Sequence, residues 1–177
     1  EIEGEAEGEA EGEGEFPPFT PPEVLNTNAA TDTGGDYFVR LDTNGAGRFI
    51  AVWRSNDALG GTPTYKDHIF KAQSNDSGAT WSTPSLLCAI PDNMDCNKPC
   101  IATDRSDNCM VLWIATLGSD RNLYLSYSGD NGITWTDPSI VDDGDTSLFY
   151  MKCRVATDCA GHWTAAWLTH SPTLNDY

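Results

Sequence analysis

An all-β fold made of repeated four-stranded antiparallel units is predicted by three observations. An octapeptide with the pattern Ser-x-Asp-x-Gly-x-Thr-Trp occurs twice, beginning at Ser74 and at Ser128, an offset of 54 residues. Three apolar stretches that each end in tryptophan align with one another without gaps. No segment combines helical periodicity with helix caps. Four short strands repeated at a period near ~50 residues are typical of the blades of a β-propeller.

The octapeptide uses residue types that suit a tight turn between strands. The eight residues that define its two copies are Ser74, Asp76, Gly78 and Trp81, and then Ser128, Asp130, Gly132 and Trp135. The aspartates can accept backbone N–H bonds inside the turn, and the glycines allow the positive φ that such a turn needs. The tryptophans offer large rings, which we expect to be buried over their units.

A second anchor sets the same register. The three tryptophans that end apolar stretches are Trp53, Trp113 and Trp167. Counting back from each of them, threonine falls at one shared position, and Asn or Asp follows it at the start of a polar turn. Each unit therefore reads as strand, turn, strand, loop, strand, tight turn and strand.

The chain divides into a tail and a repeat region. Residues 1–18 form the tail, in which eight Glu alternate with Gly, Ala or Ile over residues 1–15; without an apolar face, we expect it to be disordered. Residues 19–177 hold blades at about 19–81, 82–135 and 136–177. The third is truncated, because adding the offset to Ser128 puts the next octapeptide beyond Tyr177. A wheel of at least four blades needs roughly 220 residues, so we expect an incomplete propeller of about two and a half blades.

Charge and cysteine content argue against several classes of partner. The formal net charge is −17, and the 10 Lys and Arg residues form no cluster along the sequence, which disfavours nucleic acid. No apolar run is long enough to predict a membrane span. The 6 cysteines make disulfides plausible without fixing their connectivity, and their spacing is not that of a zinc site. We expect no cofactor or metal; the acidic loop at 142–146 offers the alternative of oxygen ligands for Ca²⁺.

The octapeptide resembles the Asp box, or BNR repeat, of sialidase-like β-propellers, in which it forms the turn between the third and fourth strands of a blade. The resemblance covers residues 19–177, and the segment from Leu25 to Asp32 looks like the connection between blades in tandem Asp-box repeat proteins. It implies a sialidase-like propeller, belonging to a non-catalytic repeat protein or to a divergent exo-sialidase. It also implies that the eight octapeptide residues are structural, because the box lies away from the substrate face in that family.

Enzymes of this family hold a substrate carboxylate with three arginines and use an Asp acid/base with a Tyr–Glu nucleophile pair. The stretch that corresponds to their Phe-Arg-Ile-Pro motif is Tyr37-Phe38-Val39-Arg40-Leu41, in which the Arg is displaced and the Pro is absent. No Glu follows Glu23. Asp57 and Asp67 lie in the long loop where the family places its acid, so they are the candidates for that role.

Two arginines are candidates for binding a ligand. Arg40 and Arg154 occupy equivalent positions in the first strands of two blades. First strands line the channel of a propeller, so both side chains are placed to meet an anion. The alternative is that they are solvated or locally paired surface arginines.

These observations predict a non-catalytic Asp-box module of a secreted or surface protein, acting as a rigid platform for glycan or protein. The alternative function is part of a divergent exo-α-sialidase whose remaining catalytic residues lie downstream; an architectural spacer is a third. The family resemblance and the cysteine count favour an extracellular or cell-surface location. An open strand edge favours contact with further blades of a parent protein or self-association.

Overall fold

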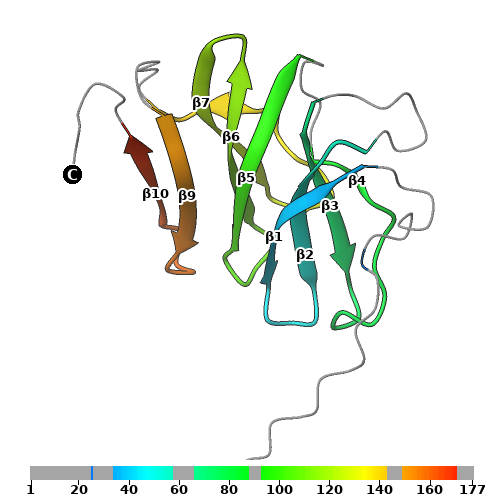
Figure 1. Cartoon of the computed structure of the whole chain (residues 1–177). Coiled ribbons are helices and arrows are strands. Elements are labelled where there is room, and N and C mark those ends of the chain that lie inside the picture. The colour runs from blue at the N-terminus through cyan, green and yellow to red at the C-terminus, as the bar shows by residue number, and fades with distance from the viewer. Residues whose placement is uncertain (1–24, 26–33, 58–65, 88–92, 143–148, 171–177) are drawn as a thin grey trace, which may run out of the picture.

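The computed structural model describes Leu25 and residues 34–57, 66–87, 93–142 and 149–170. These ranges contain ten β-strands and no helix (Figure 1), so the predicted all-β fold is confirmed for them. No helix within them is long and apolar enough to cross a bilayer. The acidic tail at 1–18 lies outside the described residues.

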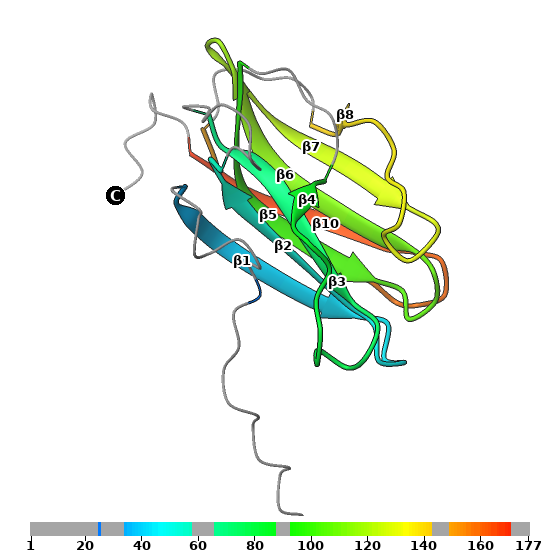
Figure 2. The ribbon, with the colours of Figure 1, turned by 90° about the vertical axis from the view of Figure 1, so that its right-hand side faces the viewer.

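The strands form three antiparallel sheets. The first sheet contains β1 (Asp36–Thr43), β2 (Phe49–Ser55), β3 (His68–Ser74) and β4 (Ser85–Leu86), in that order. The second contains β5 (Met94–Thr103), β6 (Cys109–Leu117), β7 (Asp120–Ser128) and β8 (Ser139–Ile140), again in chain order. The third pairs β9 (Phe149–Thr157) with β10 (Trp163–His170). In the perpendicular view, the strands of all three sheets lie along about the same axis (Figure 2).

Each fourth strand follows an octapeptide and pairs with the third strand of the same sheet. Leu86 lies opposite Phe70, and Ile140 lies opposite Tyr124. The first sheet therefore extends to Leu86 and the second to Ile140, past the ends at 81 and 135 that the sequence-based division gave the blades. The cause is the turn itself, after which the chain comes back along the third strand and pairs with it over two residues that begin four residues after the tryptophan.

The first strands of the three sheets are neighbours in space. β5 contacts both β1 and β9, and the three lie side by side in Figure 1. No backbone ladder joins one sheet to the next among the described residues. The sheets meet mainly through packed side chains, and one backbone hydrogen bond runs from the Cys96 N–H of β5 to the carbonyl of Asp67 beside β3 (2.8 Å). This arrangement resembles that of consecutive propeller blades, and the described residues do not close a wheel.

Two apolar cores lie between the sheets, and β6 contributes to both. Val111 and Trp113 face the first sheet, while Leu112 and Ile114 face the third, where they meet Tyr150. All four β6 side chains are at most 1% exposed. Because side chains alternate across a strand, a continuous apolar run is what a strand covered on both faces requires.

The first octapeptide forms a turn whose polar groups bond to one another. The Ser74 hydroxyl donates to Asp76 Oδ1 (2.8 Å) and accepts the Gly78 N–H (2.8 Å). Asp76 accepts the Thr80 backbone N–H at 2.8 Å and the Thr80 hydroxyl at 2.6 Å. These hydrogen bonds, from the Thr80 side chain first, lower the pKa of Asp76 to about 2. Gly78 has a φ of +88°, which its lack of a Cβ permits.

The second octapeptide repeats this network and also contacts the first sheet. Asp130 accepts the Thr134 N–H at 2.9 Å and its hydroxyl at 2.5 Å, and its pKa is likewise lowered to about 2, mainly by the hydroxyl. The Gly132 carbonyl accepts Trp135 Nε1–H at 2.8 Å and also accepts a bond from the Gln73 side chain of β3. The octapeptide is thus part of the contact between two sheets.

The tryptophans of the octapeptides are half-buried, which corrects the expectation that they are buried. Trp135 packs against the core between the first two sheets, and Trp81 packs against the outer face of the first sheet beside Trp53. Each ring packs against a cluster of buried residues and keeps part of its surface in contact with solvent.

Candidate functional site

A small hollow between the first strands gathers much of the positive charge of the chain. It encloses about 130 Å³ and is lined by Phe38 and Arg40 of β1, Lys98 of β5, and Lys152, Cys153 and Arg154 of β9. We call it the basic pocket. Four of the 10 Lys and Arg residues line it, in a chain whose net charge is −17. The predicted pair Arg40 and Arg154 is therefore brought together in one pocket.

Backbone bulges shape the wall of the basic pocket. The pairing of β1 with β2 shifts register between Tyr37 and Arg40, and that of β5 with β6 shifts between Asn97 and Cys100. Inside these bulges, Phe38 has a φ of 57° and Lys98 a φ of 51°. Left-handed backbone is unfavourable for side chains of this size, and bulges re-aim the residues they contain. Both bulged residues line the pocket.

The four cations are not neutralised by carboxylates of the described residues. Each guanidinium donates one hydrogen bond to a nearby backbone carbonyl: Arg40 Nη1 to Val39 (2.8 Å) and Arg154 Nη1 to Cys153 (2.9 Å). These bonds orient the two side chains and leave other N–H donors of each guanidinium unused within the described part of the chain. Because a guanidinium presents a planar fork of donors, the pair is suited to a carboxylate, sulfate or phosphate.

The two candidate acids occupy different environments. Asp67 Oδ2 lies 2.9 Å from Arg54 Nε, and its side chain is 17% exposed. Burial raises the pKa of Asp67, while the charge of Arg54 opposes that rise. Arg54 in turn lies over the rings of Tyr37 (4.7 Å) and Phe38 (5.8 Å). Arg54 therefore contacts both Asp67 and Phe38, and Phe38 is one of the residues that line the basic pocket.

Asp57 ends the described part of the loop, and residues 58–65 lie outside it. Its backbone N–H donates to the Ser55 hydroxyl at 3.1 Å. The structure does not bring Asp57 to the lining of the basic pocket. Of the loop proposed for Ca²⁺, only Asp142 is described, and its carboxylate accepts the Leu123 N–H.

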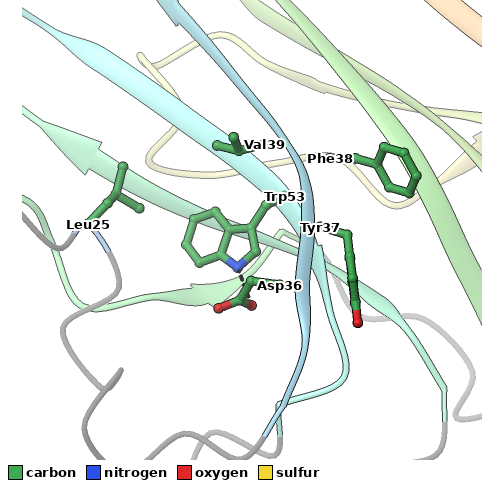
Figure 3. Close-up of a pocket in the computed structure, with 6 residues that line it drawn as sticks. All are labelled: Leu25, Asp36, Tyr37, Phe38, Val39 and Trp53. Atoms are coloured by element: carbon green, nitrogen blue, oxygen red, sulfur yellow. Dashed lines mark hydrogen bonds between the residues drawn. The ribbon is translucent and has the colours of Figure 1, made fainter.

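A second hollow, of about 220 Å³, lies on the outer face of the first sheet (Figure 3). Leu25, Val39 and Trp53 give it an apolar wall, and Trp53 Nε1–H donates to Asp36 Oδ1 at 3.0 Å. Phe38 lies on the other side of β1 from Trp53 in Figure 3. The hollow offers contact area for an apolar group, and its one carboxylate is already bonded.

Sequence reasoning missed Lys98 and Lys152. Counted from the tryptophan anchors, both fall at the repeat position of Phe38, two residues before that of Arg40 and Arg154. The alignment alone could therefore have placed all four cations on adjacent first strands. They form no cluster along the sequence because 54 residues separate Lys98 from Lys152.

Comparison with known proteins supports the fold and nothing finer. The chain is similar to a solved structure described as Hadza microbial sialidase Hz136, with a TM-score of 0.53 and 17% sequence identity over 73% of this chain. The match spans 37% of that sialidase. No protein-family model matches, and no curated protein matches. The chain therefore has a distant sialidase-like, propeller-like fold, spanning about two fifths of the solved relative.

Proposed function

We propose that this chain is a non-catalytic Asp-box repeat module of a secreted or surface protein, and that its basic pocket binds an anionic group on a glycan or protein. The observation that carries the proposal is the convergence of Arg40, Lys98, Lys152 and Arg154 on one hollow without partner carboxylates among the described residues. Like charges held this close repel one another, and a bound anion removes that repulsion. A carboxylate or sulfate on a sugar is the ligand class that fits best.

Three features support a platform rather than a catalyst. The octapeptide aspartates are held inside their own turns by threonine donors, which leaves them no role at the basic pocket. No Glu follows Glu23 in the sequence, so this chain does not itself supply the Glu of a Tyr–Glu nucleophile pair. The sheets that carry the pocket are fixed by packed cores on both faces of β6. A rigid scaffold with a surface anion site is what a binding module needs.

The test is a titration of the full chain with N-acetylneuraminic acid, glucuronic acid and a sulfated hexosamine, with the methyl ester of the first as a neutral control. Arg40→Gln and Arg154→Gln should each weaken binding of the anionic sugars by about tenfold or more, because each removes charge-assisted hydrogen bonds. Binding should also weaken as salt rises. Arg48→Gln is the matched control, since Arg48 is exposed and does not line the pocket. Equal binding of the ester, or equal loss in the Arg48 variant, would contradict the proposal.

The second candidate is a divergent exo-α-sialidase completed by residues outside this chain, and one observation favours it. Asp67 lies in the loop between β2 and β3 with a raised pKa, as a general acid requires. The chain alone should nevertheless not hydrolyse a fluorogenic sialoside, because the nucleophile pair is incomplete. Turnover that is lost in Asp67→Asn but kept in Asp76→Asn would favour the exo-α-sialidase over the non-catalytic binding module.

A further inference from the structure

Two buried thiols meet beneath the basic pocket. Cys100 lies in β5 and Cys153 in β9, and each is 2% exposed. Their sulfur atoms are 3.2 Å apart. The two strands lie side by side but belong to different sheets, with no backbone ladder between them. A covalent bond here would therefore join two sheets that no backbone ladder connects within the described residues.

The register leaves Cys100 no partner within its own sheet among the described cysteines. Cys96 precedes Cys100 by four residues on the same strand, a distance of about 13 Å at strand spacing. Cys100 lies opposite Leu112, and Cys109 is three residues further along β6, roughly 10 Å away along the strand. Disulfides need Cα atoms within about 7 Å. Cys100 can therefore reach Cys153, and cannot reach Cys96 or Cys109.

The surroundings make the two sulfurs chemically unequal. The Cys153 thiol has the Lys98 carbonyl within 3.3 Å as an acceptor and also contacts the Cys100 sulfur. The pKa of Cys100 is lowered, first by its hydrogen bond with Cys153, with the charges of Arg154 and Arg40 adding to it. The pKa of Cys153 is raised by the same contact and by burial. One sulfur is thus placed to be the thiolate and the other to keep its proton.

We propose that Cys100 and Cys153 form a disulfide that ties the second sheet to the third beneath the basic pocket. The oxidant is a low-molecular-weight disulfide such as oxidised glutathione. The Cys100 thiolate attacks it, forming a mixed disulfide and releasing one glutathione thiolate, which takes a proton. Cys153 then loses its proton and attacks the Cys100 sulfur, releasing the second glutathione. Two protein thiols are oxidised, and one glutathione disulfide is reduced to two thiols.

The bond would act on the stability of the third sheet. That sheet has two described strands and depends on its contact with the second sheet for burial. A cross-link between residues 100 and 153 also closes a long loop, which restricts the unfolded chain. The proposal concerns the thiols alone and does not depend on the pocket binding an anion.

The test uses the full chain, unfolded in denaturant and refolded with a mixture of reduced and oxidised glutathione. Free thiols are then alkylated, and the protein is digested without reduction for mass spectrometry. We expect a Cys100–Cys153 cross-linked peptide as the main disulfide species. The thermal midpoint should be roughly 5–10 °C higher than after treatment with dithiothreitol.

Cys100→Ala and Cys153→Ala should each abolish the cross-link and the effect of dithiothreitol on the midpoint. Cys109→Ala is the matched control, because Cys109 is also buried in a sheet core, and it should keep both. The peptide map of the wild type tests the proposal even where a variant fails to refold. Recovery of Cys100 and Cys153 as alkylated thiols, or of Cys100 linked to any other cysteine, overturns the proposal.

Discussion

Replacing one tryptophan of the repeat should cost far more than replacing its equivalent. Trp113 and Trp167 occupy the same repeat position, but Trp113 is 0% exposed and Trp167 is 43% exposed. Trp113 lies in the core between the first two sheets and stacks on Tyr124 of β7, with ring centroids 6.1 Å apart. In the third sheet, the described strands end with β10, so no described third strand supplies such a partner to Trp167.

The magnitude follows from burial. Trp113→Ala removes a fully enclosed ring and leaves a cavity, which should cost about 3–5 kcal/mol of unfolding free energy. Trp167→Ala removes a ring that keeps much of its solvent contact, so roughly 1–2 kcal/mol is expected. The variant Trp113→Phe separates the contribution of the buried aromatic ring from that of the indole N–H. The Trp113 indole N–H has no hydrogen-bond partner in the described part of the chain, so Phe keeps an aromatic ring there and removes a buried unsatisfied donor.

Urea unfolding followed by circular dichroism measures all three variants. At an m-value of about 2 kcal/mol/M, the transition midpoint of Trp113→Ala should fall by about 2 M, and that of Trp167→Ala by less than half as much. Trp113→Phe should lie between Trp113→Ala and the wild type. Equal losses for the two alanine variants would refute the stacked-sheet arrangement, because the repeat register alone makes the positions equivalent.

Two further predictions concern the octapeptides. The pKa values of Asp76 and Asp130 in the folded state are about 2, against 3.8 for the ordinary carboxyl, so their ionised forms stabilise the fold above about pH 4 and this stabilisation is lost between about pH 4 and 2. The thermal midpoint of the wild type should fall over that window, and a double Asp→Asn variant should show a flatter profile; parallel profiles would contradict the assignment. A Cβ on Gly132 would approach Gln73 Nε2 to 2.6 Å and Ile50 Cδ1 to 2.8 Å, whereas one on Gly78 would meet nothing within 4 Å. Because both glycines have positive φ, Gly78→Ala measures the backbone strain, and Gly132→Ala should cost about 1 kcal/mol more in urea unfolding; equal costs would mean that the second turn does not touch the first sheet.

The sequence predicted best what depends on neighbours along the chain. The octapeptide turns follow from residue types because the bonds among their Ser, Asp, Gly and Thr residues span at most four residues, as between Asp76 and Thr80. The strands followed from apolar stretches anchored on tryptophan. The bulges at Phe38 and Lys98 could not be predicted, since neither residue type favours positive φ and no glycine marks the position. The contact between Cys100 and Cys153 likewise depends on how two sheets meet, which no local pattern encodes.

The basic pocket shows how a repeat converts sequence register into a site. Stacked sheets place equivalent positions of successive first strands beside one another, so two repeat positions supply six neighbouring side chains. At one of them stand Arg40, Cys100 and Arg154; at the other stand Phe38, Lys98 and Lys152. Five of these six line the hollow, and Cys100 contributes its thiol from beneath it. Holding four cations together costs folding free energy in a chain that could disperse them over an acidic surface. Such a concentration of unneutralised charge is typical of a binding site, and its affinity for an anion should exceed that of any single arginine on the same surface.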